Sequence, residues 1–254
     1  MGDWELNKIL VTGGSGFLGS NLANELAKDK SNKVYVFDNN FRGNTQNLKK
    51  KNNLIFIKGD IRNIENVKKV IKKVNVIFHL AFINGTRNFY ERPGLVLDVG
   101  ITGTINIIKL INSTENKVKK FIYASSSEIY QTPKKIPTPE DIEAIIPDLM
   151  NPRYSYGGAK MIGELLTLYL LKKDIKKIIF RPHNIYGPNM GGLHVIPQLL
   201  KKINDKVNNV KNKNKKISLK IQGNGKETRA FCYIKDAIDA IIILSKKGKD
   251  NEIY

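Results

Sequence analysis

A tyrosine and a lysine, Tyr156 and Lys160, lie four residues apart in the sequence. In a helix this spacing places the phenol and the ammonium on one face. A tyrosine with its ordinary pKa of about 10 is a poor base at neutral pH. A nearby ammonium and a positively charged ligand would lower that pKa by stabilising the phenolate. The pair could therefore take a proton from a substrate hydroxyl, although a surface tyrosine on an amphipathic helix would give the same spacing.

An apolar stripe follows the pair along the same predicted helix and consists of Ile162, Leu165, Leu166 and Tyr169. With about 100° between successive helical residues, Tyr156 and Lys160 fall on roughly the opposite face. We therefore expect the pair to face a site. The stripe fits either the core or a dimer interface.

Polar side chains crowd the end of a predicted strand at residues 121–124. Ser125, Ser126, Ser127 and Glu128 follow it directly. Ligands of open α/β sheets bind at the carboxyl ends of the strands, so these side chains are candidates for substrate contact. A helix cap or a turn is the alternative use of serine at such a position.

A glycine-rich turn predicts a dinucleotide site. Gly13, Gly16 and Gly19 lie between a predicted strand at residues 9–11 and a predicted helix. The first glycine permits a tight turn, the second lets the backbone approach a pyrophosphate, and the third lets helix and strand pack closely. Asp38, 19 residues after Gly19, would accept hydrogen bonds from the adenosine ribose and favour NAD over NADP. The nearby Arg42 weakens that preference slightly.

Short β-branched runs alternate with helical stretches over most of the chain. The strands predicted from these runs lie at residues 9–11, 34–37, 54–57, 76–80, 121–124 and 178–180. Nearly continuous apolar runs indicate strands buried on both faces, which is typical of a parallel sheet. The pattern predicts an α/β fold with a Rossmann-type doubly wound sheet.

Prolines and glycines interrupt the alternation of predicted strands and helices after about residue 182. We therefore place a dinucleotide-binding domain at residues 1–181 and a smaller lobe at 182–254. Within the lobe we expect a polar excursion at 204–216, a strand at 217–221 and a helix at 234–246. Residues 252–254 look like a strand cut at its beginning.

Composition narrows the functional classes. The formal charge is +20, but the lysines are spread among asparagines without the interleaved aromatics that single-strand binders use, so we expect no nucleic-acid partner. The apolar runs are too short to span a bilayer and no signal peptide is visible, which predicts a cytoplasmic protein without a membrane partner. The single cysteine, Cys232, excludes an internal disulfide and a cysteine-based zinc cage. The histidines His79, His183 and His194 lack metal-ligand spacing, so we predict no metal.

Taken together, the motifs resemble the extended short-chain dehydrogenase/reductase family, in particular nucleotide-sugar epimerases and dehydratases of the UDP-glucose 4-epimerase type. They occur in family order at residues 12–19, 59–60, 79–81, 125–130, 181–188, 222–225 and 228–229, together with Asp38, Tyr156 and Lys160. The resemblance implies NAD as the cofactor and a nucleotide-diphosphate sugar as the substrate. It also implies a homodimer built from helices at 95–111 and 154–173.

The resemblance further implies a role for individual residues. Tyr156 would be the base that removes a proton from a sugar hydroxyl, Lys160 would hold the nicotinamide ribose, and Ser126 would bond the same sugar hydroxyl. Asn184 and Arg229 would contact the sugar nucleotide. The residues expected to bind the cofactor are Gly13, Gly16, Phe17, Leu18, Gly19, Asp38, Asn39, Asp60, Ile61, Leu80, Ala81, Tyr156, Lys160, Pro182 and His183.

Three functions stay open. Ser126, Tyr156 and Lys160 suffice for an epimerase that oxidises C4 of the sugar to a ketone and reduces it on the other face. Glu128 matches the acid of UDP-glucuronate decarboxylases, whereas dehydration is disfavoured because Ser127 stands where the dTDP-glucose 4,6-dehydratases carry an aspartate. The family's C-terminal part is expected to be absent after residue 254, which would truncate the substrate lobe. That absence motivates the third alternative, a non-catalytic NAD-binding protein.

Overall fold

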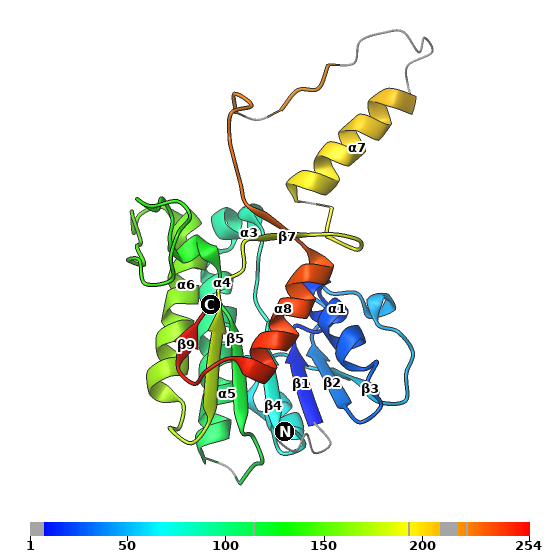
Figure 1. Ribbon diagram of the computed structural model, residues 1–254, viewed down its shortest axis with the longest axis vertical. Helices are drawn as coiled ribbons and strands as arrows, with labels where there is room; N and C mark the ends of the chain where they lie inside the picture. The colour runs from blue at the N-terminus through cyan, green and yellow to red at the C-terminus, as the bar shows by residue number, and fades with distance from the viewer. Residues whose placement is uncertain (1–7, 114, 193, 209–217, 222) are drawn as a thin grey trace.

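The computed structural model describes residues 8–113, 115–192, 194–208, 218–221 and 223–254. Its centre is a parallel sheet of seven strands in the order β3-β2-β1-β4-β5-β6-β9 (Figure 1). The strands are β1 Lys8–Thr12, β2 Lys33–Asp38, β3 Leu54–Lys58, β4 Val76–His79, β5 Lys120–Ala124, β6 Lys176–Phe180 and β9 Glu252–Ile253. The six predicted strands and the doubly wound arrangement are therefore confirmed, with strand ends that shift by one or two residues.

The sheet is buried on both faces, as the continuous apolar runs predicted. Successive residues of a strand point to opposite faces. Leu10 and Ile77 accordingly join one apolar layer, whereas Val11 and Phe78 join the other. The first layer is covered by α2 (Ile64–Ile71), α5 (Gly103–Ser113) and α6 (Ser155–Leu165), and the second by α1 (Phe17–Leu26) and α8 (Ile234–Lys247).

A continuous helical run joins α4 (Pro93–Leu97), a π-helical turn (Asp98–Thr102) and α5. The run Pro93–Ser113 is long and apolar enough to cross a membrane by length and composition, and half of its most apolar window is buried in the protein. Its buried residues, Val96, Ile107 and Ile111 among them, pack into the layer against the sheet. A core helix meets the same criterion of length and composition.

A lobe rises from the carboxyl edge of the sheet (Figure 1). In it β7 (Asn184–Tyr186) pairs in parallel with β8 (Phe231–Tyr233), and α7 (Val195–Asn208) extends away from the sheet. The strand predicted at 217–221 is wrong for the described residues 218–221, which are irregular and mostly exposed. Among the described residues no strand pairs with this backbone, and without such a partner an apolar run does not become a strand. Residues 204–208 of the predicted polar excursion belong to α7, and 209–216 lie outside the described residues.

The predicted boundary of the lobe at 182–254 is wrong for its last part, because α8 and β9 belong to the sheet. Ile234, Ile238 and Ile241 join the apolar layer beside α1, and β9 pairs with β6. An apolar helical stripe must be buried against another element, and the sheet offers that surface. The lobe is therefore residues 182–233, inserted between β6 and α8, and the strand expected at the end of the chain is confirmed as β9.

Candidate active site

The glycine-rich turn connects β1 to α1 at the carboxyl edge of the sheet. Gly13 has a φ of +67°, and a Cβ there would lie 2.7 Å from a backbone atom of the segment after β4. A Cβ on Gly19 would lie 2.2 Å from the Gly13 carbonyl oxygen, so only glycine lets α1 approach the turn this closely. Gly16 precedes α1, which Phe17 and Leu18 open, and no described side chain caps the helix. The first N–H groups of α1 are thus left for an anion such as a phosphate.

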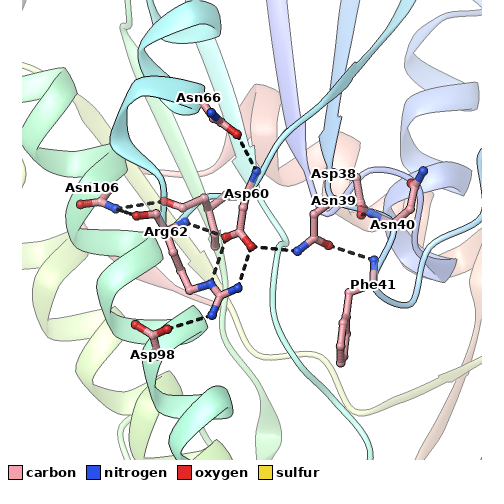
Figure 2. Close-up of polar contacts among 10 residues, drawn as sticks. Asp38, Asn39, Asn40, Phe41, Asp60, Arg62, Asn66, Asp98 and Asn106 are labelled. Carbon is pink, nitrogen blue, oxygen red and sulfur yellow. Dashed lines mark hydrogen bonds and ion pairs between the residues drawn. The ribbon is translucent and has the colours of Figure 1, made fainter.

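Asp38 ends β2 and is tied to that turn. Its carboxylate accepts hydrogen bonds from the backbone N–H groups of Ser15, at 3.1 Å, and Asn40, at 2.7 Å. The next residue, Asn39, donates through Nδ2 to Asp60 at 3.0 Å (Figure 2). Asp38, expected near the adenosine ribose, therefore lies beside Asp60, another residue expected to bind the cofactor.

Asp60 and Arg62 form a dense polar cluster after β3 (Figure 2). Asp60 accepts from the side chain of Arg62 through two nitrogens, at 2.8 and 3.1 Å. These hydrogen bonds lower the pKa of Asp60 to about 2. Ile61 turns its side chain into the core against Gly103, so that residue can meet a cofactor through its main chain.

A buried hydrogen-bond chain joins the end of β4 to the glycine-rich turn. The Thr104 hydroxyl donates to a carbonyl one helical turn earlier, so its oxygen accepts from His79 Nε2, at 2.9 Å. Burial lowers the pKa of His79 to about 3; the ring is neutral, and its Nδ1 accepts from the Thr12 hydroxyl at 2.7 Å. The Thr12 oxygen in turn accepts from the N–H groups of Leu80 and Ala81, each at 3.2 Å. The chain fixes the Leu80-Ala81 backbone beside the turn.

The predicted catalytic pair lies on the buried face of α6. Tyr156 and Lys160 are both buried, whereas Tyr169 of the apolar stripe is 81% exposed, which confirms that the pair and the stripe face opposite ways. Lys160 Nζ donates to the carbonyl oxygen of Ala124 at 2.6 Å. Burial raises the pKa of Tyr156 to about 12 and lowers the pKa of Lys160 to about 7. The protein by itself therefore does not produce the lowered phenol pKa that was expected with a bound cofactor.

Ser126 and Glu128 meet the phenol at the end of β5. Burial raises the pKa of Tyr156, and the nearby Ser126 hydroxyl opposes that rise. The Ser126 oxygen accepts from the backbone N–H of Glu128 at 3.2 Å. The Glu128 carboxylate pairs with Arg153 at 3.0 Å. The structure thus brings the three predicted residues Ser126, Glu128 and Tyr156 together.

The other predicted residues begin the lobe. The carbonyl of Pro182 accepts from the backbone N–H of Ser127 at 3.1 Å, and His183 follows with an exposed side chain. Asn184 donates to the carbonyl of residue 230 at 3.1 Å. Arg229 is exposed just before β8. Because β7 and β8 run parallel, Asn184 and Arg229 lie at the same end of this small sheet.

Three further residues surround the pair. The ring of Phe82 meets Tyr156 edge-on with centroids 5.1 Å apart, and that of Phe89, on α3 (Thr86–Glu91), stacks on Tyr156 at 4.8 Å. Arg42 reaches a carbonyl after β4, and its charge also opposes the rise in the Tyr156 pKa. Phe82 directly follows Leu80-Ala81, which could have indicated it, whereas nothing in the sequence pattern marks Phe89.

These residues fit a dinucleotide. The uncapped start of α1 suits a pyrophosphate, and Asp38 and Asp60 present acceptors on the ribose and base side. At the end of β5, Ser125 Oγ is buried and has no hydrogen-bond partner among the described residues. An unsatisfied buried hydroxyl is costly, so a polar ligand group at this position would stabilise the site.

Sequence comparison identifies the family. Residues 9–254 match the profile of the NAD dependent epimerase/dehydratase family. The chain belongs to this family. The resemblance to nucleotide-sugar epimerases and dehydratases is thereby confirmed, and so is NAD as the cofactor. The residues described above at the glycine-rich turn, β2, β3 and β4 would hold it.

Individual members of the family that resemble the chain differ in their reactions. The chain is 31% identical to a dTDP-D-glucose 4,6-dehydratase of Dictyostelium discoideum, over 99% of this chain and 58% of that protein. It is 30% identical to a UDP-N-acetyl-alpha-D-glucosaminuronate decarboxylase of Bacillus cytotoxicus, over 97% of this chain and 73% of that protein. A UDP-glucuronic acid 4-epimerase of Bacillus cereus, solved with UDP-glucuronic acid and NAD, superposes with a TM-score of 0.81 at 28% identity, over 97% and 76% of the two chains. The chain thus spans less than two thirds of the dehydratase's length.

Proposed function

We propose that the protein is an NAD-dependent epimerase of nucleotide-diphosphate sugars that acts at C4. The observation that carries the proposal is that Tyr156 and Lys160 share the buried face of α6 beside the end of β5, where Lys160 Nζ donates to the carbonyl of Ala124 at 2.6 Å. Ser126 follows Ala124 by two residues and lies close enough to the phenol to affect its pKa. This arrangement places a hydroxyl and a potential base together at the carboxyl edge of the sheet, where ligands of such sheets bind. Lys160 lies one helical turn away on the same buried face.

The chemistry follows from these groups. NAD, when bound, would supply the hydride acceptor and donor for C4. The charges of Lys160 and of a bound nicotinamide would lower the pKa of Tyr156 and allow it to act as a base. Tyr156 would then remove the proton of the C4 hydroxyl while the C4–H bond breaks, and this leaves a ketone at C4. Ser126 donates a hydrogen bond to the same oxygen. Reduction of the other face of the ketone would restore the C4–H bond, and Tyr156 would return the proton, so the configuration at C4 is inverted.

The lobe supplies the groups proposed to hold the substrate. Asn184 and Arg229 lie at one end of the β7–β8 pair, and Arg229 is exposed. A guanidinium offers paired donors that match the oxygens of a diphosphate. We assign Arg229 to the diphosphate and Asn184 to the sugar nucleotide.

Incubation with NAD and a panel of UDP-, GDP-, dTDP- and CDP-sugars tests the proposal, with products read by mass spectrometry and NMR. The expected product is an isomer of unchanged mass. Tyr156→Phe should lower turnover by roughly 10²- to 10⁴-fold, the usual contribution of a general base, with NAD binding retained. Tyr169→Phe is the matched control because this tyrosine lies on the exposed side of the same helical run. Bound NAD without any product in the whole panel would instead identify a non-catalytic NAD-binding protein.

A decarboxylase is the second candidate, and the position of Glu128 favours it. The Glu128 carboxylate is close enough to Tyr156 for its charge to raise the pKa of the phenol. One contact argues against a decarboxylase. Arg153 donates to both carboxylate oxygens of Glu128, at 3.0 and 3.3 Å, so this carboxylate already has a partner within the protein. Release of carbon dioxide from UDP-glucuronate would establish this function, and Glu128→Gln should then abolish it.

We also propose a homodimer. The stripe residues Ile162, Leu165 and Tyr169 are 37%, 51% and 81% exposed, and burial of such a face against a second copy would be favourable. Light scattering should give the dimer mass, and Leu165→Glu should give the monomer mass. A monomer at micromolar concentration of the unaltered protein would contradict the proposal. A cytoplasmic location stays a prediction.

A further inference from the structure

The segment between β4 and α3 contains the dipeptide Asn84-Gly85. The backbone N–H of Gly85 donates to the side-chain Oδ1 of Asn84 at 2.6 Å, so this nitrogen lies against the amide group of the preceding side chain. Gly85 has a φ of +107°, a conformation that favours glycine, and it carries no Cβ that would shield the amide. Asn84 is exposed, so water can reach it. The two groups that must meet when an asparagine closes into a cyclic imide are therefore already together.

Two donors converge on the main-chain oxygen of Asn84. Arg42 Nη1 donates to this oxygen, and Asn88 Nδ2 donates to it at 2.9 Å. The oxygen belongs to the same peptide group as the nitrogen of Gly85. When that nitrogen loses its proton, the negative charge is shared with the oxygen, and donors that are already in place stabilise such a developing oxyanion. The guanidinium supplies a charge-assisted hydrogen bond, which is stronger than a neutral one.

Arg42 reaches Asn84 from a segment that is fixed on the glycine-rich turn. The N–H of Asn44 donates to the carbonyl of Ser15 at 3.0 Å. Gly43 packs so closely on the same serine that a Cβ there would overlap the Ser15 side chain. The guanidinium is therefore held at the Asn84 carbonyl from a firm base.

We propose that Asn84 is a site of spontaneous deamidation and that Arg42 promotes the reaction. The nitrogen of Gly85 attacks Cγ of Asn84 and forms a bond to it. The bond from Cγ to the side-chain nitrogen breaks, and that nitrogen takes up the proton of the Gly85 N–H and leaves as ammonia. Water then opens the cyclic imide at one of its two carbonyls and gives aspartate or isoaspartate. The product places a negative charge beside Arg42, at the carboxyl edge of the sheet where the anionic cofactor would bind.

A second Asn-Gly dipeptide in the chain, Asn224-Gly225, has contacts that oppose the same reaction. The N–H of Gly225 donates to the carboxylate of Glu227 at 3.0 Å, and a negative charge there disfavours the loss of that proton. The Oδ1 of Asn224 accepts from the N–H of Lys226 at 2.9 Å, so it is directed away from the nitrogen of Gly225. Both Asn84 and Asn224 are exposed. The two sites therefore differ in their hydrogen bonds and not in their access to water.

The test measures both sites in one sample. The whole protein is incubated at mildly alkaline pH without any ligand, and its peptides are then separated and weighed by mass spectrometry. Asn84 should convert to aspartate and isoaspartate roughly 10-fold faster than Asn224, as expected when two hydrogen bonds favour the anion at one site only. Arg42→Met should slow the conversion of Asn84 by about 3- to 10-fold and leave that of Asn224 unchanged. Arg87→Met is the matched control, because Arg87 pairs with Glu91 on the nearby α3, and it should change neither rate.

Three results would overturn the proposal. The first is an Asn84 that stays unmodified, and the second is an equal or faster conversion of Asn224. The third is an unchanged or faster conversion of Asn84 in Arg42→Met, which would show that the guanidinium does not stabilise the anion. Asn88→Ala provides a second variant, because it removes the other donor to the same oxygen. It should slow Asn84 by about 2- to 10-fold, and an unchanged rate would count against the proposal. None of these results depends on whether a sugar is epimerised.

Discussion

The ammonium of Lys160 lies 3.9 Å from the centre of the Phe82 ring, directly over an aromatic face. The ring attracts the cation, and the carbonyl of Ala124 accepts its hydrogen bond. Burial acts in the opposite sense and lowers the pKa of Lys160 to about 7. The lysine therefore titrates near neutrality, and its charge beside Tyr156 depends on pH.

Lys160→Met should change how stability depends on pH. The pKa of Lys160 is lower in the folded protein, about 7, than its ordinary value of 10.5, so between these values the unfolded chain binds more protons. Stability of the unaltered protein should therefore rise with pH by up to about 1.4 kcal/mol per unit from this residue. Urea unfolding from pH 7.5 to 9.5 should show this slope relative to Lys160→Met. Equal slopes for the two proteins would contradict the burial of a titrating lysine.

Protonation of His79 should destabilise the folded protein in acid. Its pKa falls from 6.5 to about 3 on folding, so its contribution is complete above pH 6.5 and is lost as the pH falls towards 3. The loss should reach about 1.4 kcal/mol per unit, and His79→Gln should remove that part of the slope between pH 6 and 4.5. Nitrogen NMR should also show a neutral ring protonated at Nε2, because Thr104 accepts there and Thr12 donates to Nδ1. A ring protonated at Nδ1 would refute the buried chain.

The buried ion pair of Arg181 and Glu164 should show strong coupling. The two groups lie 2.7 Å apart and each side chain is only 7% exposed. Arg181→Met should cost about 3–5 kcal/mol of unfolding free energy because it leaves a buried carboxylate without its partner. The double variant with Glu164→Leu should cost clearly less than the sum of the single changes. Additive losses in a urea double-mutant cycle would show that the pair does not act as a unit.

Gly19→Ala should push α1 away from the glycine-rich turn. Its methyl group would lie 2.2 Å from the Gly13 carbonyl oxygen and 2.6 Å from the Gly14 Cα, and backbone atoms cannot step aside as a flexible side chain does. We expect a loss of about 1–3 kcal/mol in stability, typical of overpacking, and weaker NAD binding by calorimetry. Gly94→Ala is the control, since a Cβ there meets nothing within 4 Å. That change should be neutral or stabilise the protein by about 0.4–1 kcal/mol.

Much of the fold could be predicted because its signals are local. Continuous apolar runs define the strands from β1 to β6, and the glycines with Asp38 define the cofactor edge. The helical period alone places Tyr156 and Lys160 opposite the apolar stripe. The boundary of the lobe could not be predicted in this way. The return of α8 and β9 depends on a pairing between β6 and β9, residues more than 70 positions apart in the chain.

Some residues around the predicted site could not be predicted because their contacts come from elements that are distant in the sequence. Phe89 stacks on Tyr156 from a helix that is far away in sequence, and no spacing rule connects them. Arg62 directly follows the predicted Asp60 and Ile61, but its ion pair with Asp98 joins it to a helical run far away in sequence. Such contacts are set by tertiary packing, whereas the glycine motif is set by the conformation of a single turn.

The lobe leaves and re-enters the sheet at nearly the same place. Gly187, soon after β6, lies against Ile234, the first residue of α8, where a Cβ would come within 2.4 Å of the isoleucine side chain. Because the two ends of the lobe are in contact, a lobe of different length or sequence could replace it without altering the order of the strands. If the lobe holds the sugar nucleotide as proposed, cofactor binding and sugar choice are separable in this architecture. A graft of residues 188–233 from another member should then change substrate preference while the dinucleotide site stays intact.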